Sequence, residues 1–441
     1  MKESSYNFFY EFQKDPSKLI AYNSRTNSLA LINKKDYAEL KKYVENGVQI
    51  EDAKLLKELQ KGEFLIEPDI NELEILKFKM FASRYSSKGL GLTIAPTLDC
   101  NFACTYCYEK GKNEGYMSKE VQNNIIKFIE KQSKFIEQLS ISWYGGEPLL
   151  AMEAIENITN KVLEIVKREK IKFSAMIVTN GYNLTKDTLL KLKKLNIKAM
   201  QVTIDGTGET HNSRRPLKNG GPTFERILSN LSENKKYLPS TNLRVNIDKE
   251  NIKSLEEILE VIKEYNLEKT VATYPGYIEP TNDCYSVNNC LEVCDFSKVE
   301  YEFHERLQAV NFVPNIDYKY PYIKTNVCTA DNLNSMVIDP KGDIYKCWSD
   351  VGRSEYKISN ISENKMINLE KFFQYILYDP TIDEDCKDCE VLPLCMGGCP
   401  RRRVDNIVDR CTSYKYVLEG YIKNIALNKY RELNNEKVER R

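Results

Sequence analysis

Three cysteines within eight residues are the first candidates for chemistry in this chain. Cys100, Cys104 and Cys107 are spaced C-x3-C-x2-C, and the apolar run from Leu90 to Ile94 just before them is typical of a buried strand. The cysteines therefore lie on the loop leaving the C-terminal end of a strand, where α/β folds place their chemistry. Three thiolates can hold three corners of an iron–sulfur cube, which normally has four cysteine ligands. One iron then keeps an open position, as a reactive metal site requires.

Spacing alone leaves two other interpretations open, a zinc site that lacks its fourth ligand and three unconnected core cysteines. The distribution of the thirteen cysteines favours metal or redox chemistry, because none lies before Cys100 and ten lie beyond residue 283. Disulfides do not persist in a cytosolic chain, so crosslinks do not explain this number. The two histidines, His211 and His304, are too few for zinc or haem chemistry built on imidazole.

The stretch from Cys100 to Cys107 resembles the radical S-adenosylmethionine (SAM) enzymes, whose signature is C-x3-C-x-aromatic-C, with Tyr106 at the aromatic place. The resemblance implies a 4Fe–4S cluster on these three cysteines whose open iron binds SAM. An external one-electron donor, of flavodoxin or ferredoxin type, would then drive the splitting of SAM, and the radical formed removes a hydrogen atom from substrate. The cofactor carries that chemistry, while the protein positions it and excludes water and oxygen.

Alternating strand and helix patterns follow as far as about residue 280. We expect strands at 90–95, 139–144, 173–179, 199–204, 243–247 and 270–274. Amphipathic helices are expected between them at 119–137, 151–169, 186–195, 223–237 and 252–265. Six such units with short connections predict an α/β fold with a parallel sheet, and right-handed crossovers would curl it into a partial barrel. This agrees with the six-unit β/α barrel of the radical SAM family.

Loops after three of these strands carry glycines and polar residues. Gly145, Gly146 and Glu147 follow the second strand; glycines let a backbone approach a ligand, and a carboxylate can pair with an ammonium group. Asn180 follows the third strand, beside a flexible Asn-Gly turn. Arg215 ends a DG-x4-H-x3-RP stretch after the fourth strand.

The resemblance implies a role for each of these residues in binding SAM. Gly145, Gly146 and Glu147 match the GGEP motif that holds the SAM amino group. Asn180 is the expected contact to the SAM ribose or carboxylate, with a plain turn as the other interpretation, and Arg215 is expected to grip the carboxylate as a bidentate fork. For Asp205 and His211 in the same stretch, bracing of the loop is an alternative, which we favour for His211.

Seven cysteines in the C-terminal quarter resemble the SPASM extension of radical SAM peptide-modifying enzymes. Their order is C-x13-G-x4-C, with Gly342 in an expected hairpin turn, then C-x2-C-x5-C-x3-C and a last cysteine. The family wiring implies one auxiliary cluster on Cys386, Cys389, Cys395 and Cys411. It implies a second auxiliary cluster on Cys328, Cys347 and Cys399.

The fourth position of that second auxiliary cluster is supplied elsewhere or stays open to a substrate thiolate. A zinc ribbon is the alternative for this region, but it would leave three of the seven cysteines stranded. Cys284, Cys290 and Cys294 match neither pattern, and their role stays open.

The first 85 residues resemble a small winged-helix module. An apolar hairpin is expected at 19–32, helices at 35–46 and 51–60, a short strand at 64–66 and a charged helix at 71–84. In radical SAM enzymes that act on ribosomal peptides, a similar module binds the leader segment as an added strand at a sheet edge. A purely structural cap is the other interpretation.

Composition limits the partners. Lys plus Arg and Asp plus Glu both number 64, so no global charge recruits nucleic acid or an anionic membrane. No apolar run is long enough to span a bilayer and no signal peptide is present, so we expect a cytoplasmic protein. The basic run Arg401-Arg402-Arg403 is expected to be a solvated face.

These features divide the chain into five expected parts. They are a leader-recognition module (1–85), the radical SAM partial barrel (86–280), a linker with extra cysteines (281–324), a SPASM domain (325–415) and a C-terminal helix (416–441).

The resemblance implies an enzyme that removes hydrogen from a ribosomally made precursor peptide and installs a crosslink, expected to be a cysteine thioether. Rival interpretations are a sulfatase-maturating oxidation of Cys or Ser, a carbon–carbon crosslinking maturase, and, in another class, a non-catalytic iron–sulfur carrier or structural zinc protein. Sulfatase maturases place an Asp directly after the cysteine that corresponds to Cys347, whereas Trp348 stands here. No catalytic base or acid is identified.

Overall fold

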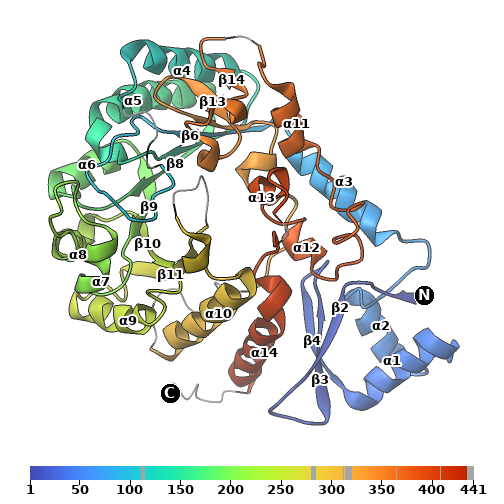
Figure 1. The fold of residues 1–441 in the computed structure, drawn as a ribbon. Coiled ribbons are helices and arrows are strands. Elements are labelled where there is room, and N and C mark those ends of the chain that lie inside the picture. The colour runs from blue at the N-terminus through green and yellow to red at the C-terminus, as the bar shows by residue number, and fades with distance from the viewer. Residues whose placement is uncertain are drawn as a thin grey trace.

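A sheet runs through the centre of the computed structural model (Figure 1). The structure describes residues 1–109, 111, 115–279, 285–310, 312, 320–363, 365–407 and 409–434. Six neighbouring strands run parallel, in the order in which the chain visits them: β6 (Gly89–Ile94), β7 (Gln138–Trp143), β8 (Lys172–Thr179), β9 (Ile197–Thr203), β10 (Ser240–Ile247) and β11 (Val271–Tyr277). The predicted six-unit parallel sheet is confirmed.

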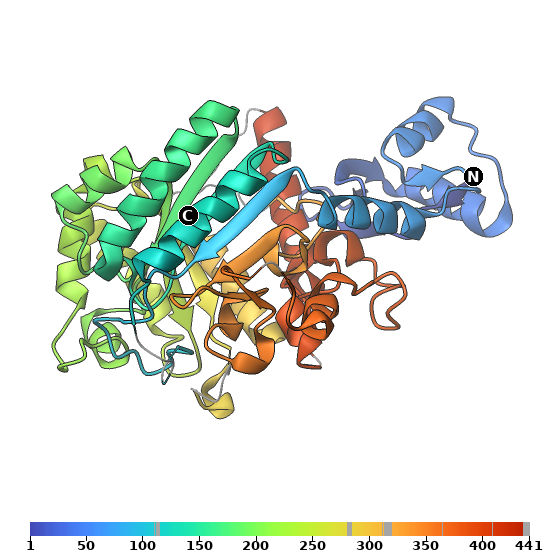
Figure 2. The same ribbon diagram turned by 90° about the horizontal axis from the view of Figure 1, so that it is seen from above.

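Helices cover the outer face of this sheet (Figures 1 and 2). They are α4 (Lys119–Gln132), α5 (Met152–Glu169), α6 (Lys186–Lys194), α7 (Gly208–Arg214), α8 (Phe224–Glu233) and α9 (Ser254–Glu264). Buried aliphatic side chains of strands and helices form one apolar core, which keeps the strands in place and leaves the loops at their ends to carry function. The helix expected at 119–137 is shorter than predicted and ends at Gln132, where the amide of Ser133 donates to the carbonyl of Ile129.

The C-terminal region extends the same sheet, which the sequence did not predict. β12 (Ser335–Ile338) pairs in parallel with β6, and β13 (Asp343–Tyr345) and β14 (Ser359–Asn360) follow it in antiparallel order. The expected hairpin turn at Gly342 is confirmed by the pairing of β12 with β13. Because β6 pairs with β7 on one side and β12 on the other, the strand that leads into the first cysteine loop also carries the C-terminal extension of the sheet.

The remaining C-terminal helices pack around this extension. They are α10 (Val293–Ala309), α11 (Leu369–Ile376), α12 (Leu392–Cys395), α13 (Pro400–Val404) and α14 (Tyr414–Leu433). α10 lies in the stretch expected to be a linker, and it packs on α14, where the ring Nδ1 of His304 and the hydroxyl of Tyr421 are 3.0 Å apart. No helix in the described part of the chain is long and apolar enough to cross a membrane.

The expectation of a solvated basic face at 401–403 was wrong. Arg401, Arg402 and Arg403 are all buried on α13. Each guanidinium forms an ion pair with an acid from another part of the chain: Arg401 with Asp350, Arg402 with Glu279 and Arg403 with Asp331. Burial of so much charge is tolerated only where partners are present.

An N-terminal module, made of β1–β5, α1 and α2, projects to one side of the molecule (Figure 2). A sheet ordered β2-β3-β4 is formed by β2 (Asn7–Glu11), β3 (Lys18–Asn23) and β4 (Ser28–Asn33), and β1 (Lys2–Glu3) pairs with β5 (Leu65–Ile66). The helices are α1 (Lys34–Asn46) and α2 (Ala53–Lys61). The predicted hairpin is confirmed. β2 was missed because its aromatic residues on both faces hide the alternation that marks a strand.

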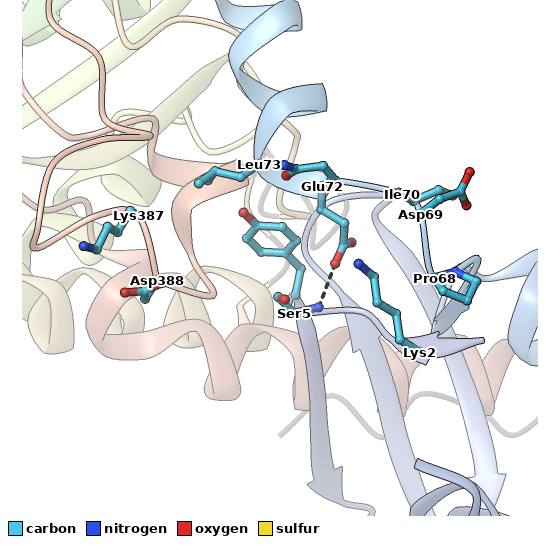
Figure 3. A pocket seen from close by; sticks show the side chains of 11 residues that line it. Lys2, Ser5, Pro68, Asp69, Ile70, Glu72, Leu73, Lys387 and Asp388 are labelled. Atoms are coloured by element: carbon cyan, nitrogen blue, oxygen red, sulfur yellow. Dashed lines mark hydrogen bonds between the residues drawn. The ribbon is translucent and has the colours of Figure 1, made fainter. Parts of the chain in front are cut away.

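The helix α3 (Glu72–Arg84) joins this module to the rest of the molecule (Figures 1 and 2). At its first residue, the buried carboxylate of Glu72 accepts hydrogen bonds from the Ser4 hydroxyl at 2.6 Å and the Ser5 amide at 2.8 Å, the latter drawn in Figure 3. It also pairs with the Arg25 guanidinium at 2.6 Å. The module is therefore fixed to α3 by a buried ion pair.

Replacing Arg25 by Gln should loosen the module, because removal of one partner of a buried pair leaves the other charge uncompensated, at a cost of about 3–5 kcal/mol. Lys34→Gln is the matched control, since it breaks an exposed pair with Glu11 in the same module and should cost about 0–1 kcal/mol. Hydrogen exchange of the β2–β4 amides measures both opening free energies. Equal losses in the two variants would contradict this account.

Candidate functional site

The first cysteine loop leaves β6 at the expected place. Burial raises the pKa of Cys100 to about 12, and the charges of Cys104 and Cys107 add to the shift. Burial likewise raises the pKa of Cys107 to about 12. The three thiols thus lie within electrostatic reach of one another, at a site where each is protonated until a metal displaces its proton.

Gly145 and Gly146 lie directly beneath this loop. A Cβ on Gly145 would lie 2.3 Å from the Thr97 carbonyl oxygen, and one on Gly146 would lie 2.3 Å from that of Asp99. Gly145 also has φ +134°, a conformation that favours glycine. The two glycines therefore allow the backbone of one loop to lie against that of the other.

The Glu147 carboxylate is fully buried and bonded within the protein. It accepts hydrogen bonds from the Thr179 hydroxyl at 2.8 Å, the Leu149 amide at 3.0 Å and the Asn180 amide at 2.7 Å. Burial nevertheless raises the pKa of this carboxyl, and the hydrogen bonds oppose that effect. Glu147 thus ties the loop after β7 to the loop after β8.

Asn180 lies beside the cysteine loop. Its side-chain amide nitrogen donates to the Asn101 carbonyl oxygen Oδ1 at 2.7 Å and lies 3.9 Å from the Sγ of Cys100. Its Oδ1 accepts from the amide of Tyr182 at 3.0 Å. Asn180 therefore lies beside the first cysteine loop and is oriented by two neighbours.

Tyr106 connects the cysteine loop to the loop after β9 and to strand β10. Its hydroxyl donates to the Asp205 carboxylate and accepts from the Arg215 Nη1 at 2.7 Å and the Asn246 side-chain amide at 3.0 Å. The Arg215 Nε is buried with no hydrogen-bond partner among the described residues. The Cys104 thiol is among the charges that act on Arg215. Arg215 is thus a fixed cation beside the cysteine loop with a donor to spare.

His211 braces its loop, as expected. Its Nδ1 accepts from the Asp205 amide at 3.1 Å, and its Nε2 is 3.1 Å from the Thr223 hydroxyl. Burial, together with the charges of Arg215 and Arg214, lowers the pKa of the ring well below its usual range. The neutral imidazole therefore acts as a structural crosslink.

Three C-terminal cysteines form a second group. The charges of Cys328 and Cys399 act on the Cys347 thiol, after the larger effect of burial, which raises its pKa well above its usual value. Burial raises the pKa of Cys328 to about 12. Cys347 follows the short strand β13 and Cys399 precedes α13, so the sheet extension brings the two together.

Four more cysteines form a third group near α12 and α14. Burial, followed by the charges of Cys395, Cys386 and Cys389 among its neighbours, raises the pKa of Cys411 to about 11. The amide of Cys389 donates to the carbonyl of Cys386 at 3.0 Å in a tight turn. Electrostatic influence among these thiols is thus seen within each of the three expected sets, while their role as metal ligands stays a prediction.

The other cysteines lie elsewhere. Cys290 is buried. Burial raises the pKa of its thiol, and the charge of Asp248 raises it further. Cys294 lies on α10, where its charge acts on Tyr416 of α14. Cys284 lies outside the described residues.

Two aromatic residues that the sequence analysis did not select join the barrel to the C-terminal region. Trp348, next to Cys347, stacks on Tyr144 with ring centroids 5.5 Å apart. The Tyr144 hydroxyl donates to the Glu109 carboxylate at 2.7 Å and contacts the hydroxyl of Tyr108. The only local signal was position, since Tyr144 directly precedes Gly145 and Trp348 directly follows a cysteine.

Each cysteine group offers thiols, the donors that iron–sulfur clusters use. A single zinc ion needs all its sulfurs about 2.3 Å from one point. Among the described residues, no group of three or more His, Cys, Asp or Glu side chains is arranged to hold one metal ion. In a cube each cysteine binds a different iron, so the ligands stand further apart.

A hollow of about 590 Å³ lies between the N-terminal module and the loop of the third cysteine group (Figure 3). Lys2 and Ser5 line it from the module, Asp69 and Glu72 from the start of α3, and Lys387 from the turn between Cys386 and Cys389. Its lining is polar and carries both signs of charge.

Comparison with known proteins gives a family match for the barrel. The family model for the Radical SAM superfamily matches residues 94–262. A cysteine-type anaerobic sulfatase-maturating enzyme from Clostridium novyi is 25% identical over 378 residues, which are 77% of this chain and 97% of that protein. The radical SAM cyclopropyl synthase TigE from Paramaledivibacter caminithermalis is 25% identical over 363 residues, 73% of this chain and 72% of that protein.

Solved structures share the fold. Native anSMEcpe with bound AdoMet and Cp18Cys peptide superposes with a TM-score of 0.61 at 22% identity, over 77% of this chain and 99% of that chain. Streptococcus suis SuiB bound to precursor peptide SuiA superposes with a TM-score of 0.53 at 16% identity, over 90% of this chain and 95% of that chain. The predicted partial barrel is confirmed by these similarities.

Gly146→Ala should displace the first cysteine loop, since the new methyl group would meet backbone carbonyls that cannot move aside. We expect a lower thermal midpoint and loss of most of the iron bound by the first cysteine group. Gly89→Ala is the matched control, because its Cβ would meet open space. Thermal unfolding and iron analysis after anaerobic reconstitution measure both effects, and a Gly146→Ala protein with full iron content would contradict the assignment.

Proposed function

Because residues 94–262 are a radical SAM domain and the chain is therefore a radical SAM enzyme, we propose that it installs an intramolecular thioether crosslink in a ribosomally made precursor peptide. The observation that carries this proposal is the division of ten cysteines into three sets whose members act electrostatically on one another. One set lies in the barrel and two lie in the C-terminal region, which matches the wiring implied by the SPASM resemblance.

In this proposal the chain's own residues hold SAM at the first cluster. Cys100, Cys104 and Cys107 ligate the cluster, which with SAM bound supplies the radical that removes hydrogen from the peptide. Arg215 holds the SAM carboxylate through its unpaired Nε. Asn180 contacts the ribose or carboxylate from its position beside Cys100.

The amino group of SAM is assigned to the loop after β7. Gly145 and Gly146 bring the backbone of that loop against the cysteine loop. Glu147 holds its shape through three internal hydrogen bonds. In this proposal Glu147 contributes to binding the amino group of SAM by holding this loop in shape.

Two auxiliary clusters are proposed in the C-terminal region. Cys386, Cys389, Cys395 and Cys411 ligate one. The other has Cys328, Cys347 and Cys399 and an open or externally supplied fourth position. With its fourth position open, a cluster held by these residues would take the thiolate of a substrate cysteine.

A precursor peptide with a leader segment is the proposed partner. The three-stranded β2-β3-β4 sheet of the N-terminal module has two edges that can accept an added strand. The polar hollow of Figure 3 lies between this module and the Cys386–Cys389 turn. The described cysteines are all unpaired, which suits a reducing cytoplasm, where a flavodoxin or ferredoxin would supply the electron.

A sulfatase-maturating oxidation is the second candidate, favoured by relatives that share 25% identity over nearly their whole length. Against it, Trp348 stands where the resemblance places an Asp base. The nearby Asp350 is fully buried, paired with Arg401 at 2.7 Å and bonded by the Tyr375 hydroxyl at 2.6 Å. It is therefore held as a structural acid.

Cys104→Ala should abolish formation of 5′-deoxyadenosine when the reconstituted protein receives SAM and dithionite without oxygen. The loss should exceed about a hundredfold, because a cluster with two protein ligands does not hold SAM productively. Cys294→Ala, outside the three groups, should retain the activity. Chromatography of the reaction measures the product, and its persistence in Cys104→Ala would remove the basis of the proposal.

Co-expression with small cysteine-containing peptides encoded beside the protein should yield a peptide that has lost two hydrogens per crosslink and whose cysteine resists alkylation. Removing the leader from the same peptide should reduce the yield at least about tenfold, because docking on the module supplies effective concentration. Tandem mass spectrometry checks both results. An oxidised Cys or Ser without a crosslink would favour the second candidate instead.

A further inference from the structure

A buried carboxylate joins two arginines from opposite ends of the chain beside the second cysteine group. Asp331 lies 3.3 Å from the Nη2 of Arg84, the last residue of α3, and 3.6 Å from the Nη2 of Arg403 on α13. Arg84 and Asp331 are 0% exposed, and Arg403 is 8% exposed. The charges of Arg403 and Asp331 both act on the Cys328 thiol.

Two buried arginines share one carboxylate at this place. Among the described residues, Asp331 is the one acid within ion-pair distance of Arg84 or Arg403. Other acids lie in the surroundings, since the charge of Asp379 acts on Arg84 and that of Asp350 acts on the Cys347 thiol. The ammonium group of Lys346 is also buried there and donates to the carbonyls of Asn332 and Ser335, at 2.5 and 2.6 Å. One carboxylate cannot pair fully with both guanidinium groups.

Part of the hydrogen-bonding capacity of the arginines is unused, although the Arg403 Nη1 donates to the Gly398 carbonyl at 3.2 Å. The Nε atoms of Arg84 and Arg403 are buried without a hydrogen-bond partner among the described residues. The Arg84 Nη1 donates to the Tyr378 carbonyl, and the Arg403 guanidinium lies 4.0 Å from the centre of the Tyr378 ring. Leaving buried donors unpaired costs free energy. This arrangement therefore favours a negatively charged group bound beside the two arginines.

Asp331 also shapes the cysteine loop. Its carboxylate oxygens accept hydrogen bonds from the amides of Val327 and Cys328, both at 3.2 Å. The arginines are therefore held at a fixed position relative to the first cysteine of the group.

We propose that Arg84 and Arg403 are positioning residues that balance the negative charge of the auxiliary cluster on Cys328, Cys347 and Cys399 and raise its reduction potential, with Asp331 setting the size of the effect. This inference rests on the proposed function. Nearby positive charge favours the reduced, more negative cluster, and net charge around a cluster is a main determinant of its potential. Because Arg84 ends α3, the helix that holds the N-terminal module supplies part of this charge.

Redox titration of the holoenzyme, followed by electron paramagnetic resonance, tests the proposal. The signal of this cluster is the one that Cys328→Ala removes. Arg84→Gln should shift its midpoint potential to more negative values, and Asp331→Asn should shift it to more positive values while keeping one acceptor for the Cys328 amide. Arg84→Lys, which keeps the charge, should stay near the wild-type value.

Arg168→Gln is the control for loss of an arginine, because it breaks an exposed pair with Glu130 and should leave the potential unchanged. Iron content is measured for every variant, and if Arg84→Gln fails to fold, Arg403→Gln takes its place. A purely structural role predicts lower iron content with an unchanged midpoint potential, or shifts of the same sign in Arg84→Gln and Asp331→Asn. Either result would overturn this inference and leave the proposed function standing. Absence in the wild type of any signal that depends on Cys328 would overturn the proposed function as well.

Discussion

The pairing of β6 with β7 on one side and β12 on the other is the constraint on which the rest of the structure depends. β6 leads into the first cysteine loop, β7 leads into the two glycines that lie against that loop, and β12 begins the hairpin that delivers Cys347. Register between parallel strands is set by backbone hydrogen bonds. β6 therefore links the barrel to the C-terminal extension that carries Cys347. The stacking of Trp348 on Tyr144 adds a direct contact between these two parts.

Burial of charged and ionisable side chains is the second feature that shapes the structure. Burial raises the pKa values of Cys100 and Cys347, so ionising these thiols costs free energy that a bound metal would supply. Fixed cations from distant segments, Arg215 beside the first group and Arg403 beside the second, lower the cost of negative charge there. The long-range ion pairs that anchor α3 at both ends therefore connect folding of the N-terminal module to the electrostatics of the sites.

Local patterns in the sequence predicted most of the barrel, because strands such as β10, where buried Leu243 and Val245 alternate with Arg244, carry a two-residue period. Short spacing also marked the first cysteine loop, whereas the assignment of the C-terminal cysteines to two clusters came from the family resemblance and stays a prediction. What local patterns could not predict depends on partners far along the chain. The pairing of β12 with β6 has no local signature, and the run at 401–403 looked solvated because its acids, such as Asp331, come from other segments.

The central claim is that ten cysteines hold three iron–sulfur clusters, and iron analysis with Mössbauer spectroscopy tests it most directly. The account predicts about 12 iron atoms per anaerobically reconstituted chain, all in cubane clusters. It also predicts the loss of about one third of this iron when one cysteine of a single group is changed to alanine. A chain that bound one isolated metal ion per group, or whose iron content was indifferent to these cysteines, would contradict it.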